Sequence, residues 1–170
     1  MSKRETNRNN DEEFSQEDLR ILSEESRERD ERNGYDLENC TYRGKDQTHQ
    51  IVEEPYKKHY PWSYVKLEDG SFRFSPRLTS RQPNLPNQRI GMTLPHSMLA
   101  RGKPVIGAGE CETDENGKVI SIDNFSGHYK PGEKNLKETK KNMESKGLST
   151  PLTQWILRRF DGKGNVIKEL

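Results

Sequence analysis

Cysteine is scarce in this chain, and long apolar runs are absent. There are two cysteines among 170 residues, Cys40 and Cys111, and their spacing fits neither a disulfide framework nor a zinc site. No apolar run approaches the ~20 residues that a membrane helix needs, and the N-terminus has no hydrophobic signal-peptide core. We therefore expect no membrane partner and a protein that is cytoplasmic in the producing cell; if it is exported into a target cell, it travels without an N-terminal signal peptide.

Apolar residues are also few, at 28% against 34% charged residues, so the whole length cannot pack as one domain. Residues 1–40 carry 7 Lys and Arg against 13 Asp and Glu, a net charge of −6, whereas the whole chain has a net charge of +1. This division predicts a polar leader over residues 1–58 and a single folded domain over residues 59–170. We interpret the leader as largely disordered or partly helical, and as a secretion, chaperone-binding or partner-binding segment.

A helix is predicted inside the leader. Ser15 followed by Asp18 is typical of a helix start, and Asn33-Gly34 would end the helix. Leu19 and Leu22 give it only a weak apolar edge. We expect such a helix to have little to pack with and to form on a partner or not at all.

The rest of the chain favours an α+β fold with a small antiparallel sheet built from hairpins. A helix is predicted over residues 133–146, ended by Gly147 with Leu148 behind it. An irregular loop is expected over residues 75–89. Hairpins are predicted around three turn sequences: Asp69-Gly70, Asp114-Glu115-Asn116-Gly117 and Asp161-Gly162-Lys163-Gly164-Asn165.

The block from His96 to Pro131 concentrates small residues, two histidines and a tyrosine. It opens with His-Ser-Met-Leu-Ala-Arg-Gly-Lys-Pro-Val-Ile-Gly-Ala-Gly-Glu and closes with Ser-Gly-His-Tyr-Lys-Pro at residues 126–131. Gly107 and Gly109 would weaken a strand, so they mark either a closely packed neighbour or a ligand laid against the backbone.

This block resembles a domain at the C-terminal ends of large secreted bacterial proteins of the polymorphic-toxin kind and in bacterial effector-like proteins. It is also similar to the conserved domain of plant IQ-motif calmodulin-binding proteins. The resemblance covers about residues 61–150, and Ser-Gly-His-Tyr-x-Pro is its most specific part. This chain has Ser97-Met98 where the family has a second serine and a phenylalanine. The resemblance implies a toxin, effector or signalling module, with an immunity protein, a chaperone or a host protein as partner.

Calmodulin is not an expected partner. Residues near an IQ-like spacing occur between Gln154 and Val166, but Thr153 and Arg159 depart from the motif. Asp161-Gly162-Lys163-Gly164 would break the helix that such a motif needs. We interpret the spacing as chance within a hairpin.

The end of a strand next to a helix N-terminus suits a phosphate-bearing ligand, because unpaired amides and the helix dipole point there. The hypothesis assigns ligand binding to Ser97, Gly107, Gly109, Ser126, Gly127 and Lys130, and catalysis to His96, His128 and Tyr129.

One enzymatic version is ADP-ribosyl transfer from NAD. His96 would bond a ribose hydroxyl, Tyr129 would stack on nicotinamide, and an acid from Glu144, Asp161 or Glu169 would stabilise positive charge. A second version is a metal-independent ribonuclease-like toxin, with His96 and His128 as acid and base on a phosphodiester. In this version the substrate is a nucleic acid. The reaction needs no metal, and no group of His, Asp and Glu residues in the sequence has the spacing of metal ligands.

A structural interpretation stands beside these. Ser126 to Pro131 would form a turn in which Tyr129 covers the edge of the core, and His96 would be a half-buried, hydrogen-bonded side chain. Trp62 and Trp155 are expected in the core or on a sheet face. The class of function that competes with an enzyme is a non-catalytic protein-binding or signalling module.

Overall fold

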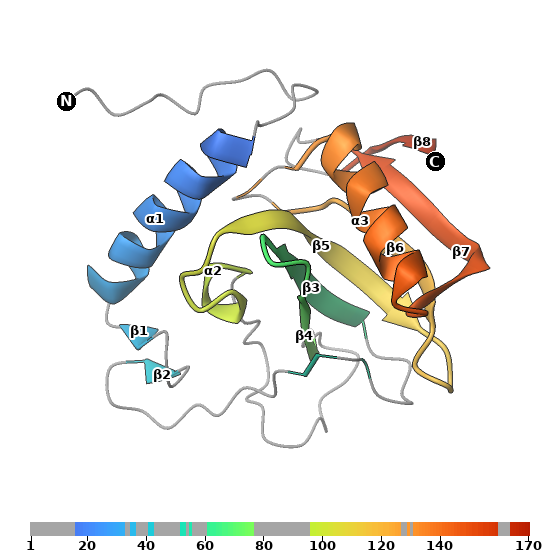
Figure 1. Ribbon diagram of the computed structural model, residues 1–170, viewed down its shortest axis with the longest axis horizontal. Helices are drawn as coiled ribbons and strands as arrows, with labels where there is room; N and C mark the ends of the chain where they lie inside the picture. The colour runs from blue at the N-terminus through green and yellow to red at the C-terminus, as the bar shows by residue number, and fades with distance from the viewer. Residues whose placement is uncertain are drawn as a thin grey trace.

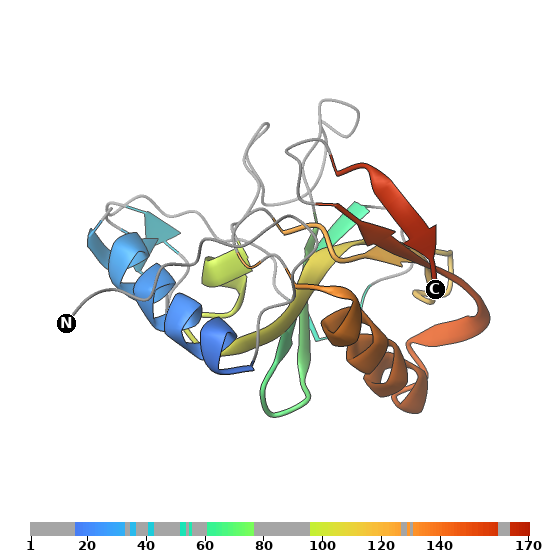
Figure 2. The same ribbon diagram turned by 90° about the horizontal axis from the view of Figure 1, so that it is seen from above.

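A six-stranded sheet with helices packed against it forms the body of the protein (Figures 1 and 2). The computed structural model describes residues 16–32, 35–36, 41–42, 52–53, 55, 61–76, 96–126, 129, 131–159 and 164–170. The strand order is β4-β3-β5-β6-β7-β8, and β1 pairs separately with β2. The α+β class is therefore confirmed.

The helices and strands have the following bounds: α1 Gln16–Arg32, β1 Tyr35–Asp36, β2 Thr41–Tyr42, β3 Pro61–Leu67, β4 Phe72–Pro76, α2 His96–Leu99, β5 Val105–Thr113, β6 Val119–Asp123, α3 Glu133–Ser145, β7 Ser149–Arg158 and β8 Val166–Glu169. The helices α1 and α2 lie side by side at one end of the sheet, and α3 lies at the other (Figures 1 and 2).

The three predicted hairpins are confirmed. The β3–β4 turn contains Gly70 at φ +89°, and the β5–β6 turn contains Gly117 at φ +78°, a region that glycine enters without a Cβ clash. The Asp114 carboxylate accepts hydrogen bonds from the Asn116 and Lys118 amides at 2.8 and 2.9 Å, which closes the second turn. The third hairpin pairs β7 with β8. The expected loop over residues 75–89 is wrong at its start, because Ser75 and Pro76 belong to β4 and pair with β3. The rest of that range lies outside the described residues.

The predicted end of α3 is also confirmed. Gly147 has φ +69°, and the Leu148 amide donates to the Met143 carbonyl at 3.1 Å. Leu148 is buried behind this cap, as expected for a glycine cap followed by an apolar residue.

One strand pair differs from the expected antiparallel sheet. The strands β6 and β7 run parallel, with Ile122 opposite Trp155, while the other pairs in the sheet are antiparallel. Parallel neighbours need a crossover connection, and α3 supplies it. The chain therefore contains a β6–α3–β7 unit, and its connection from strand to helix includes the described residues 124–126, 129, 131 and 132.

The core lies on both faces of β3, because alternate side chains of a strand point to opposite faces. Trp62 and Tyr64 belong to a cluster that includes Leu136 and Met143 of α3. A second cluster, on the side of α1 and α2, is made of Leu19, Leu22, Val65, Leu67, Leu99, Ala100, Val105, Ala108 and Tyr129. Trp62 and Trp155 are 0% and 1% exposed, which confirms their predicted place in the core.

The helix α1 corrects the expectation for the leader. Leu19 is 0% and Leu22 is 6% exposed, and both pack in the second cluster. The prediction that this helix has little to pack with is wrong, because the apolar side of β3 and β5 receives both leucines. The folded unit therefore includes residues 16–32 and is not confined to residues 59–170. None of the helices in the described part of the chain is long and apolar enough to cross a membrane.

Substitution of Leu19 tests whether α1 belongs to the folded unit. We expect Leu19→Ala to lower the free energy of unfolding by about 2–5 kcal/mol, since it leaves a cavity in the core. Leu152→Ala is the matched control because Leu152 is 89% exposed, and it should change stability by no more than about 0.5 kcal/mol. Urea unfolding of the full chain measures both. Equal stability of the two variants would contradict the docking of α1.

Candidate functional site

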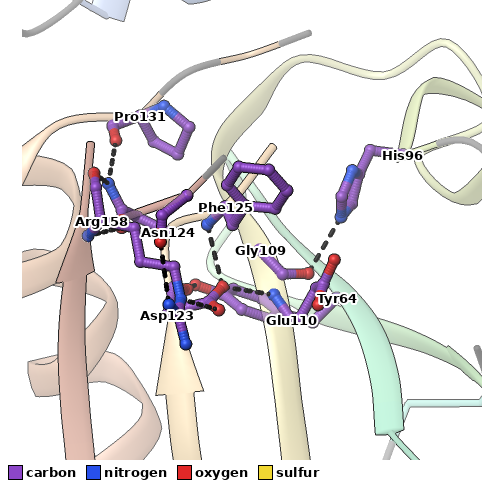
Figure 3. Close-up of polar contacts among 10 residues, drawn as sticks. Tyr64, His96, Gly109, Glu110, Asp123, Asn124, Phe125, Pro131 and Arg158 are labelled. Atoms are coloured by element: carbon purple, nitrogen blue, oxygen red, sulfur yellow. Dashed lines mark hydrogen bonds and ion pairs between the residues drawn. The ribbon is translucent and has the colours of Figure 1, made fainter. Parts of the chain in front are cut away.

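The centre of the candidate site is the carboxyl end of β6, where Asp123 is buried between β5 and β7 (Figure 3). Its Oδ1 atom accepts hydrogen bonds from the Glu110 and Phe125 amides, both at 2.9 Å. Its Oδ2 atom accepts from Nε of Arg158 at 2.8 Å. Burial raises the pKa of Asp123, and the hydrogen bonds and the Arg158 charge oppose that shift only in part.

Asn124, the next residue, fastens the start of the loop. Its Nδ2 atom donates to the carbonyls of Pro131 at 2.9 Å and Arg158 at 3.2 Å, and its Oδ1 atom accepts from the Arg158 amide at 2.7 Å (Figure 3). One buried side chain thus joins the end of β6 to β7 and to the residue that precedes the N-cap of α3. These hydrogen bonds hold Asn124 close to Pro131 and to Arg158.

His96 approaches the same place from α2. Its Nε2 atom lies 2.9 Å from the Gly109 carbonyl oxygen, and the imidazole points toward that oxygen in Figure 3. Because a carbonyl oxygen only accepts hydrogen bonds, Nε2 carries the proton. The interaction of His96 with Asp123 also lowers the pKa of the carboxylate, which places the imidazole near the end of β6. His96 is half-buried, as the structural interpretation expected.

Ser97, beside His96 in sequence, faces α1 instead. Its hydroxyl donates to Oδ2 of Asp30, and both residues are buried. The other oxygen of Asp30 accepts from the Arg29 guanidinium at 3.1 Å. Ser97 therefore has its hydroxyl engaged within the protein rather than turned toward His96.

Tyr129 lies in the core cluster beside α1, with 1% of its surface exposed. Burial raises the pKa of Tyr129 to about 12, while hydrogen bonds with the Ser26 and Ser23 side chains oppose the shift. Its amide donates to the Ser126 hydroxyl at 3.2 Å, and Ser126 is itself buried. In this arrangement the ring covers the edge of the core, and it does not offer a face for stacking.

The two glycines of β5 are accounted for by packing. A Cβ at Gly107 would lie 2.6 Å from the Thr139 hydroxyl of α3, and a Cβ at Gly109 would lie 2.2 Å from the Asp123 carbonyl oxygen. These positions need glycine because the protein's own atoms approach there. The interpretation as a closely packed neighbour therefore describes Gly107 and Gly109.

The structure brings His96 and Gly109 together with Asp123, and it places Ser97, Ser126 and Tyr129 in contacts on the inner side of the loop. The predicted residues Gly127, His128 and Lys130 lie outside the described residues. Of the acids proposed to complete a transferase site, Glu144 on α3 and Glu169 on β8 are exposed, and Asp161 is not described. Among the described residues, no group of three or more His, Cys, Asp or Glu side chains could hold a metal ion.

Sequence reasoning missed four residues that shape this region: Asp30, Asp123, Asn124 and Arg158. The adjacent Asp123-Asn124 pair at the end of an alternating strand was an available signal, because short polar side chains often bond to the backbone where a strand ends. No comparable signal marks Arg158.

Comparison with protein-family models, curated proteins and solved structures gives no match. The resemblance to toxin, effector and plant calmodulin-binding domains stays a prediction.

Titration of Tyr129 gives a test of its burial. The folded protein holds this proton more tightly than the unfolded chain, so the stabilisation is fully present below pH 10 and lost as the pH rises through about 12. We expect Tyr129→Phe to lose less stability than the native chain between pH about 9 and about 12. Urea unfolding at both values measures this, with Leu152→Ala as the control that keeps the native pH dependence. An identical loss in Tyr129→Phe would contradict the burial of this hydroxyl.

Alanine at the two glycines tests the packing account. Gly109→Ala should abolish folding or cost more than about 3 kcal/mol, because the added methyl group meets backbone atoms that cannot swing away. Gly107→Ala should cost about 1–3 kcal/mol, and Thr139→Ala should recover part of that loss by removing the opposing hydroxyl. Thermal and urea unfolding report both. If Gly109→Ala were as stable as the native chain, close approach of β6 would not be the reason for glycine there.

Proposed function

We propose that this chain is a toxin- or effector-type enzyme that acts on a nucleotide-containing substrate, held at the loop between β6 and α3. The observation that carries the proposal is the parallel β6–α3–β7 unit. It sets the carboxyl end of β6 before the amino end of α3, and His96 of α2 approaches that place through its contact with the Gly109 carbonyl of β5. Ligands of sheets with such units bind outside the carboxyl ends of parallel strands.

The start of α3 supports the choice of an anionic ligand. The helix follows Gly132, which provides no side-chain hydrogen bond to the first amides. Unpaired amides and the helix dipole favour negative charge at this end. The one acidic residue of the first turn, Glu133, is paired with Lys137 at 2.9 Å and Lys168 at 2.6 Å, which offsets its repulsion of a phosphate.

His96 is the residue to which we assign a chemical role. Its protonated Nε2 bonds the Gly109 carbonyl, which orients the ring beside Asp123. In an ADP-ribosyl transferase the imidazole would bond a ribose hydroxyl of NAD. In the ribonuclease-like alternative it would exchange a proton with a phosphodiester, together with His128.

The burial of Tyr129 separates these two reactions. Stacking of its ring on nicotinamide requires the ring to leave the core cluster beside α1, where it is 1% exposed. Hydrolysis by two histidines requires no such movement. The transferase version therefore predicts that substrate binding exposes Tyr129, and the ribonuclease version predicts that it stays buried.

A non-catalytic binding module is the second candidate, and a specific observation favours it. Ser97, Ser126 and Tyr129 all have their hydrogen-bonding groups engaged inside the protein. An enzyme presents such groups to its substrate, whereas a binding module needs them only to hold its own fold. The partner in that case would be an immunity protein, a chaperone or a host protein.

Binding and activity of the full chain test the proposal. We expect ADP-ribose or a short RNA to bind in isothermal titration calorimetry, and His96→Ala to weaken binding about tenfold or more, as for a lost hydrogen bond to a charged ligand. Release of nicotinamide from NAD, or cleavage of total RNA, then identifies the reaction. Growth arrest on induction in a bacterium or in yeast reports toxicity.

Two variants control this experiment. His96→Gln keeps a donor for the Gly109 carbonyl and removes the titratable ring, so it should fold normally and lose activity. Lys141→Ala on the exposed side of α3 should behave as the native chain. If the folded native chain binds none of these ligands and leaves growth of both hosts unchanged, the enzymatic proposal is wrong and the binding module takes its place.

A further inference from the structure

We propose that α1 controls the candidate site, with Asp30 acting through Ser97 as the positioning residue for His96. This inference rests on the proposed function for its consequence, but its structural part can be measured without any ligand. It assigns the N-terminal helix a role beyond stability.

The buried stripe of α1 is apolar at its start and polar toward its end. Leu19 and Leu22 fill the core, and they are followed on the same face by Ser23, Ser26 and Asp30, which are 2%, 1% and 3% exposed. Leu19 and Leu22 supply the apolar part of the contact, whereas burying a carboxylate is costly unless it is paired. The polar half of the stripe therefore determines which residues outside α1 form hydrogen bonds with this helix.

The first group that α1 holds is α2. The Ser97 hydroxyl donates to Asp30, and both side chains are buried. Adjacent residues of a helix point about 100° apart, so a Ser97 that faces α1 directs His96 away from α1. That direction leads to the Gly109 carbonyl, where Nε2 of His96 is found at 2.9 Å.

The helix α2 spans only four residues, His96–Leu99, and its Leu99 carbonyl accepts a hydrogen bond from Arg73 at 3.3 Å. Arg101, two residues beyond its end, has a φ of +52°, which is unusual for a residue with a side chain. A helix this short is not stable by its own hydrogen bonds. Its position therefore depends on contacts with the rest of the fold: the burial of Leu99 and Ala100, the hydrogen bond from Arg73 and the contact of Ser97 with Asp30. Of these, the contact with Asp30 acts on the residue next to His96.

The second group that α1 holds is the far end of the β6–α3 loop. Tyr129 hydrogen bonds with the side chains of Ser26 and Ser23, and Ser23 also accepts from the Val105 amide at 3.1 Å. The helix α1 therefore contacts both α2, which carries His96, and Tyr129, which anchors the loop. Docking of α1 holds His96 and Tyr129 in one arrangement, and release of α1 frees both from it.

Substitution of Asp30 tests this role. In Asp30→Ala we expect the nuclear magnetic resonance signals of the His96 ring to shift without any ligand, because α2 is no longer held. We also expect ADP-ribose binding to weaken about tenfold or more. Asp30→Asn keeps an acceptor oxygen for Ser97 and should restore most of both. Glu31→Ala, an exposed neighbour on the same helix, is the matched control and should leave both unchanged.

The outcomes separate this inference from the proposed function. Unchanged His96 signals in folded Asp30→Ala would overturn the positioning role, whatever the protein binds. Shifted His96 signals in a chain whose native form binds no ADP-ribose would support the positioning role and count against the nucleotide proposal. If Asp30→Ala does not fold, Ser97→Ala removes the same contact from its other end, and the same shift of the His96 signals is expected.

Discussion

A buried carboxylate joins three strands at the point on which the shape of the sheet depends. Asp123 ends β6, accepts an amide of β5 and pairs with Arg158 of β7. Without this carboxylate, the Glu110 and Phe125 amides and Nε of Arg158 would each lose a hydrogen bond. Burial disfavours the charge and raises the pKa of the carboxyl, yet the surrounding donors leave each oxygen bonded. The bonds to Glu110 and Arg158 tie the end of β6 to both of its neighbouring strands.

The same end of β6 leads toward α3, so the contacts that hold the sheet together also position the candidate site. Tyr64 donates to the Asp123 carbonyl at 2.6 Å, and Asn124 ties the loop to β7 and to Pro131. Asn124, Pro131 and Tyr129 are thus each held by contacts with the rest of the fold. Groups that are already held in place bind a ligand at a lower entropic cost than free ones.

Local signals in the sequence predicted most of the elements. Asp69-Gly70, the Asp114 turn and Gly147 are decided by backbone angles that few residues tolerate, and each was located correctly. The parallel pairing of β6 with β7 was not predicted. A helix of the length of α3 can be followed by a strand that runs parallel or antiparallel to β6. The docking of α1 was missed for a related reason. Two leucines are a weak pattern alone, and their burial depends on an apolar surface of β3 and β5 that no local signal describes.

The candidate site shows the same division between local and long-range information. His96 stood out by residue type, and its partner, the carbonyl of Gly109, follows from a strand register that the sequence does not reveal. Tyr129 stood out in the same way, but residue type does not distinguish a ring that stacks on a ligand from one that closes a core. The contacts of Tyr129 distinguish the two cases. Its hydroxyl bonds to two serines of α1 and its ring packs among leucines, so the side chain is held in the core. Any chemistry that uses its ring therefore requires the ring to break its contacts with α1, whereas chemistry at His96 alone does not.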